Sequence, residues 1–157
     1  MSLSVAAQEF TRADSLRGSI TPQRAWWDVM RYDIEVQPDY DKQFTSGANQ
    51  ITYKVVQEKH PDVMQIDLQE PLVIDRILFD DATELQFKRE GNVYWVNTLP
   101  QELDSEHTVK IFFSGNPHVA VRPPWDGGWS FSKDAEGRPL MTVTCQGLGA
   151  SIWYPNK

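Results

Sequence analysis

The sequence has a single cysteine, Cys145, which excludes a disulfide framework and any zinc site built from several thiolates. It has no apolar run near the roughly 20 residues that a membrane-spanning helix needs. Positive charge is also scarce, since 15 lysines and arginines stand against 22 aspartates and glutamates, a formal net charge of −7. Nucleic acids and anionic membranes bind basic surfaces, so we expect neither as a partner.

Several catalytic motifs are missing as well. There is no H-E-x-x-H zinc motif, no G-x-S-x-G nucleophile motif, and no glycine-rich loop joining a strand to a helix. Cys145 has no neighbour in the sequence that would activate its thiol, so we expect a small buried residue on a strand. We expect surface or loop positions, not metal ligation, for His60, His107 and His118. Turn positions are expected for Asp39, Asp41, Asp80 and Asp81.

A two-residue alternation of apolar and polar residues dominates the chain from residue 29 onward and predicts half-buried strands. The first run contains Tyr32, Ile34 and Val36, and others cover residues 51–56, 64–69, 72–79, 84–88, 93–98 and 108–114. Strands at about ten-residue spacing pair antiparallel, because parallel strands need long crossovers. The sequence therefore predicts an all-β fold, an antiparallel β-sandwich in a single domain. Helix is expected only as a turn within residues 14–24.

The first residues indicate processing. Met1, Ser2 and Leu3 are typical of an expression-vector start. Residues 4–7 then place small side chains at both key positions of a signal-peptidase site, with Gln8 as the first residue of the mature chain. We therefore expect an exported protein. Residues 1–28 are assigned to the vector remnant, the end of a signal peptide and an N-terminal extension, and residues 29–157 to the sandwich.

The last third of the chain holds the least ordinary residues. Residues 114–128 contain three prolines and three glycines and predict a long structured loop, a kind of segment that is often functional. A last strand over residues 140–145 then leads to Gln146. The tryptophans of this region can stack on sugar rings, pack in a core, or be covered by another domain: Trp125, Trp129 and Trp153.

Over nearly its whole length the chain resembles the N-terminal domain of M1-family zinc aminopeptidases, the group of leukotriene A4 hydrolase and aminopeptidase N. The resemblance rests on Tyr-Asp-Ile at residues 32–34, Phe-Thr-Ser-Gly at 44–47 before the strand at 51–55, and Ile-Phe-Phe-Ser-Gly at 111–115. Its most specific parts are P-P-W-D-G-G-W at 123–129 and T-C-Q-G-L-G-A-S-I-W-Y-P at 144–155. Together they are similar to the exported bacterial branch of the family.

The resemblance implies a saddle-shaped sandwich followed, after residue 157, by a catalytic domain that holds the zinc and most of the substrate site. This chain would be inactive alone, and its parent would remove N-terminal residues from peptides. The resemblance assigns Gln146 to the free amino end of the substrate, with Thr144 and Gly147 beside it, although many members have glutamine and alanine at those two positions. A neutral amide suits the role, because it accepts from an ammonium and donates to a peptide carbonyl. Interface positions with the catalytic domain are expected for Trp125, Trp129, Trp153 and Tyr154.

Two other functions stay open. A carbohydrate- or ligand-binding sandwich module predicts Trp125, Trp129 and Trp153 in line on one exposed face. The aminopeptidase domain instead predicts these rings near the C-terminal edge of the fold, as packing or interface residues. A purely structural, adhesin-like sandwich predicts no aromatic cluster.

Overall fold

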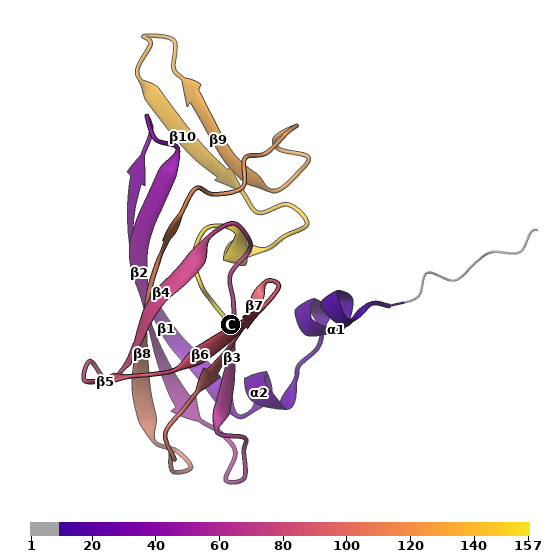
Figure 1. Ribbon diagram of the computed structural model, residues 1–157, viewed down its shortest axis with the longest axis vertical. Helices are drawn as coiled ribbons and strands as arrows, with labels where there is room; N and C mark the ends of the chain where they lie inside the picture. The colour runs from indigo at the N-terminus through magenta and orange to yellow at the C-terminus, as the bar shows by residue number, and fades with distance from the viewer. Residues whose placement is uncertain (1–9) are drawn as a thin grey trace, which may run out of the picture.

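The computed structural model describes residues 10–157, so the predicted vector and signal-peptide residues, 1–8, lie outside the described part. Within it, strands dominate (Figure 1). The helical elements are α1 (Arg12–Gly18), α2 (Pro22–Ala25) and a 3-10 helix, η1 (Ala150–Ile152). The strands are β1 (Trp27–Asp39), β2 (Phe44–Val55), β3 (Val63–Asp67), β4 (Val73–Phe79), β5 (Thr83–Glu84), β6 (Phe87–Glu90), β7 (Val93–Asn97), β8 (Glu106–Gly115), β9 (Gly128–Lys133) and β10 (Pro139–Thr144). None of the described helices is long and apolar enough to cross a membrane.

The strands form three sheets, and all their pairings are antiparallel. A five-stranded sheet has the order β1-β2-β8-β4-β5, and a three-stranded sheet has the order β3-β7-β6. Buried side chains from both sheets make up one core. The hairpin of β9 and β10 stands apart, at one end of the long axis of the molecule (Figure 1). The predicted all-β antiparallel sandwich is confirmed.

The sequence alternation places one side of each strand in the core. In β2, Ile51, Tyr53 and Val55 have no exposed surface. In β1 the core-facing positions change parity, because the pairing with β2 shifts register between Val29 and Arg31. Such a β-bulge adds one residue to a strand and so reverses which side chains point inward.

The N-terminal segment belongs to the packed structure. Trp26 and Trp27 are fully buried, and β1 begins two residues before the sequence-based boundary at residue 29. The helical turn expected before Pro22 is present as α1, whereas α2, which begins at Pro22, was not predicted. Thr11 and Asp14 form a capping box at the start of α1. Each side chain accepts a hydrogen bond from the backbone N–H of the other residue, so two N–H groups that the helix itself leaves unpaired are satisfied. Leu16 is the buried residue of this helix.

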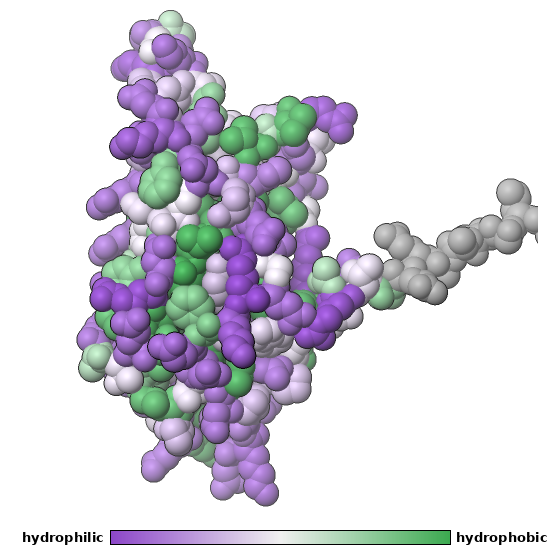
Figure 2. Space-filling view, in the orientation of Figure 1, coloured by the Kyte–Doolittle hydropathy of each residue, from purple (hydrophilic) through white to green (hydrophobic). Residues whose placement is uncertain are grey.

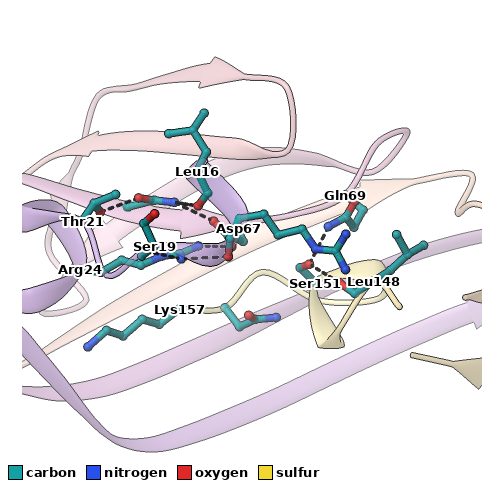
Figure 3. A network of polar contacts seen from close by, with 12 residues as sticks. Leu16, Ser19, Thr21, Arg24, Asp67, Gln69, Leu148, Ser151 and Lys157 are labelled. Atoms are coloured by element: carbon teal, nitrogen blue, oxygen red, sulfur yellow. Dashed lines mark hydrogen bonds and ion pairs between the residues drawn. The ribbon is translucent and has the colours of Figure 1, made fainter. Parts of the chain in front are cut away.

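A polar network attaches both ends of the described chain to β3 (Figure 3). Arg24 from α2 forms an ion pair with Asp67, the last residue of β3. The backbone of Asp67 exchanges two hydrogen bonds with Asn156, of 2.8 and 3.0 Å. Beyond the strand, Nε2 of Gln69 donates to Oγ of Ser151 at 3.0 Å. The C-terminal segment is therefore bound along the edge of β3.

Candidate functional site

Gln146 lies on an exposed turn directly after β10, where the sequence predicts it. The turn, residues 145–149, is named here the Gln146 turn. The backbone N–H groups of Leu148 and Gly149 donate to the carbonyl of Cys145, at 3.3 and 2.9 Å, and close it. Gly147 has a φ of +69°, a left-handed conformation that glycine adopts without strain. A Cβ at this position would meet no atom within 4 Å, so the space beside Gln146 is open.

Thr144 and Cys145 lead into this turn. Thr144 is half-buried and pairs with Gly128 of β9. Cys145 is exposed, so the prediction of a buried residue on a strand is wrong. The reason is that β10 ends at Thr144, which leaves Cys145 in the turn. Burial, and secondarily the Cys145 thiol of this turn, raises the pKa of Tyr154.

The segment between β8 and β9, residues 116–127, is named here the Trp125 loop. The carboxylate of Asp126 accepts hydrogen bonds from the N–H groups of Val121 and Arg122, at 2.7 and 2.8 Å. Burial opposes ionisation of Asp126, but these hydrogen bonds outweigh it and lower its pKa. Trp125 is 83% exposed and Val121 is 81% exposed. Figure 2 shows hydrophobic side chains gathered in this region of the surface, at the upper right. The loop thus presents apolar side chains from a braced backbone.

The Trp125 loop is also bonded to β9. The N–H of Trp129 donates to the carbonyl of His118 at 2.8 Å, and the N–H of Ala120 donates to the carbonyl of Trp129 at 2.9 Å. Gly128 has a φ of +143°, and a Cβ there would lie 2.6 Å from the backbone nitrogen of Ala120. Only glycine lets the loop approach the strand this closely.

The Trp125 loop and the Gln146 turn touch each other at Gly127. A Cβ on Gly127 would lie 2.7 Å from the carbonyl oxygen of Gln146 and 2.9 Å from Cδ1 of Leu148. The predicted substrate residue and the exposed tryptophan therefore belong to two segments in direct backbone contact. Nothing in the local sequence around Gln146 signals this contact, because its partner lies 19 positions earlier.

The three tryptophans of the last third occupy different environments. Trp129 is only 4% exposed, and its ring stacks on Phe131 with centroids 6.0 Å apart. Trp153 is half-buried and packs edge to face against Tyr154, with ring centroids 4.4 Å apart. Trp125 alone of the three is largely exposed. A sugar-binding platform of three exposed rings in line is therefore not present, because Trp129 is covered.

The histidines make local contacts. His60 stacks on Trp26 with ring centroids 4.3 Å apart. His107 lies in β8 and is half-buried, so the expectation of a surface or loop position is wrong for it. Its Nδ1 forms a hydrogen bond of 2.8 Å with the carboxylate of Asp80. His118 lies in the Trp125 loop, as expected. Within residues 10–157, no three or more His, Cys, Asp or Glu side chains are grouped to hold a metal ion. The described residues thus do not fit a zinc site.

Two adjoining cavities separate α1 from the end of the Gln146 turn. Their volumes are about 360 and 260 Å³, and Arg17, Asp67, Gln69 and Leu148 line both. The sequence does not predict them, because their walls come from α1, β3 and the C-terminal segment, which are far apart along the chain. They lie between Leu148, near the end of the Gln146 turn, and the N-terminal helix α1.

Comparison with solved structures shows which proteins of known structure share this fold. The chain is similar to native yeast LTA4 hydrolase, with a TM-score of 0.64 and 16% identity over 83% of this chain and 20% of that one. It is also similar to an M1 zinc metallopeptidase from Deinococcus radiodurans, with a TM-score of 0.56 and 18% identity over 83% of this chain and 29% of that one. No family model and no curated protein matches the sequence. The chain thus has the fold of a region that LTA4 hydrolase and M1 zinc metallopeptidases contain, and spans less than a third of their length.

Proposed function

We propose that this chain is the N-terminal, non-catalytic domain of an exported M1-type zinc aminopeptidase. The observation that carries the proposal is the shared fold, with TM-scores of 0.64 and 0.56, in a chain whose last strand leads to an exposed Gln146. A longer polypeptide would supply the catalytic domain and its zinc. Among the described residues no group of His, Cys, Asp or Glu side chains is placed to hold that zinc.

In this proposal Gln146 binds the amino end of a peptide substrate. Its amide oxygen accepts a hydrogen bond from the substrate ammonium, and its NH2 group donates to a peptide carbonyl. The side chain does not titrate, so it orients the substrate without exchanging a proton. Thr144 lies two positions before it and Gly147 directly after it, and the open space beside Gly147 leaves room for a ligand. A mutant of the Deinococcus enzyme has been solved with a Tyr-Ser-Ala substrate, and short peptides are the substrate class that we propose here.

The aromatic residues around this turn would meet the catalytic domain. Trp125 is largely exposed and Trp153 and Tyr154 are half-buried, so all three keep surface that a partner could cover, and we assign them to the interface. Trp129 contributes from beneath, because its buried ring stacks within the hairpin that carries the turn. The carbohydrate-binding alternative is weaker, since it needs an exposed Trp129.

The test uses the full polypeptide and the isolated 157-residue chain. We expect the full polypeptide to retain zinc after dialysis and cleave aminoacyl-anilides, and the isolated chain to do neither. Gln146→Ala should lower kcat/KM of the full enzyme by about 1–3 kcal/mol, the cost of an unpaired buried partner. Gln37→Ala, which removes an exposed glutamine from β1, is the matched control and should leave kcat/KM unchanged.

Each part of the proposal has an outcome that removes it. Zinc-dependent turnover by the isolated chain would refute the domain assignment, and an unchanged kcat/KM for Gln146→Ala would remove Gln146 from the site. Export is tested by sequencing the N-terminus of the native mature protein. A start far from residue 8 would contradict it.

A further inference from the structure

Trp125 has an environment that the fold of the chain alone does not account for. Its side chain is 83% exposed, and Val121 in the same loop is 81% exposed. Burying such a tryptophan in a partner would remove a large apolar area from water. Buried tryptophans are among the side chains that most often dominate protein interfaces.

The backbone that carries Trp125 is already braced. The two hydrogen bonds to Asp126 and the bond from the Trp125 N–H to the Arg122 carbonyl, 2.9 Å, hold the loop. A partner that binds this loop therefore does not have to order it first, which lowers the cost of association. The arrangement is that of a preformed anchor.

The anchor is coupled to Gln146. Gly127, two positions after Trp125, leaves no room for a Cβ against the Gln146 carbonyl and the Leu148 side chain. The Gln146 turn thus rests on the backbone of the loop, and a displacement of the loop displaces the turn.

We propose that Trp125 is a positioning residue, which inserts into an apolar pocket of the catalytic domain and, through Gly127, sets the position of Gln146. The inference rests on the proposed function. The catalytic domain is the occupant that we assign, for two reasons. The matched structures extend far beyond the region that this chain covers, and the anchor is continuous with the turn whose side chain must reach the substrate. A small displacement of a substrate-binding group is costly, since about 1 Å can reduce a rate about 100-fold.

The test is a double-mutant cycle in the full polypeptide, with kcat and KM measured separately on an aminoacyl-anilide. Trp125→Ala should lower kcat/KM about tenfold or more, chiefly through a higher KM, and Trp125→Phe should restore most of the loss. The double variant with Gln146→Ala should lose no more than Gln146→Ala alone, because Trp125 acts through Gln146. Leu140→Ala, which removes an exposed leucine from β10, is the control and should match the wild type.

A second variant tests the coupling with Trp125 intact. Gly127→Ala directs a Cβ at the Gln146 carbonyl and should lower kcat/KM as Trp125→Ala does. Thermal melting of each variant as the isolated chain checks folding, and we expect Trp125→Ala to melt as the wild type does because its ring is exposed. Additive losses in the cycle, or an active enzyme unaffected by Trp125→Ala, would overturn the inference and leave the proposed function standing. A full polypeptide without zinc-dependent aminopeptidase activity would overturn both.

Discussion

The ion pair between Arg24 and Asp67 gives a direct test of how the N-terminal segment is held. The two side chains are only 11% and 17% exposed. Arg24→Met keeps a long apolar side chain and removes the charge, so the Asp67 carboxylate, only 17% exposed, loses its cation. Breaking a fully buried pair costs about 3–5 kcal/mol. We expect about 2–3 kcal/mol here, because the pair keeps some exposure and Nε2 of Gln65 still donates to Asp67 at 3.2 Å.

The assay is urea and thermal unfolding of the isolated chain, followed by circular dichroism at neutral pH. A loss of this size lowers Tm by roughly 4–12 °C in a domain of this length. Replacing both partners, Arg24→Met with Asp67→Leu, also removes the carboxylate that the single variant leaves without a cation, and should recover most of the lost free energy of unfolding. Arg31→Met is the matched control, because its pair with Asp33 is exposed and should contribute under about 1 kcal/mol. If the double variant were as unstable as Arg24→Met, the unpaired charge of Asp67 would not be the cause of the destabilisation.

Two further predictions concern single side chains. Burial raises the pKa of Tyr53, whose hydroxyl donates to Gln101 at 2.8 Å. The native state therefore keeps the Tyr53 proton at pH values where the unfolded chain loses it, so the free energy of unfolding is unaffected by this group below about pH 10 and falls above it by up to about 1.4 kcal/mol per pH unit. Tyr53→Phe should flatten this fall in unfolding measurements between pH 9 and 11. An unchanged slope would contradict the prediction. Cys145 is exposed, so Ellman's reagent should label the native chain at nearly the rate of the unfolded chain. Cys145→Ser should change the free energy of unfolding by less than about 0.5 kcal/mol. A native thiol protected from the reagent would contradict this prediction.

The sequence predicted the strands well because alternation reports directly which side chains face a core. In β2, each apolar residue of the predicted face is buried: Ile51, Tyr53 and Val55. The bulge in β1 was not predictable in this way. Alternation is read within one strand, whereas a bulge is defined by the pairing of two strands, here by the register between Val29 and Arg31.

The candidate site was predictable only in part, for a similar reason. The sequence located Gln146 at the end of the last strand, but it extended that strand through Cys145 and so buried the thiol wrongly. The end of β10 at Thr144 depends on its pairing with Gly128. The contact of Gly127 with the Gln146 turn is likewise non-local and has no signature in composition or periodicity.

Trp125 and Trp129 show how the fold separates residues that the sequence cannot. They lie four positions apart in one aromatic, glycine-rich segment, yet Trp129 stacks on Phe131 inside the hairpin while Trp125 projects from a braced loop. The buried ring is accounted for by packing within this chain. The exposed ring has no such account, because a folded chain gains little by holding a tryptophan in water on a rigid support. The functional content of the last third therefore lies in what the fold leaves uncovered, Trp125 and Gln146, and in the glycine that joins them.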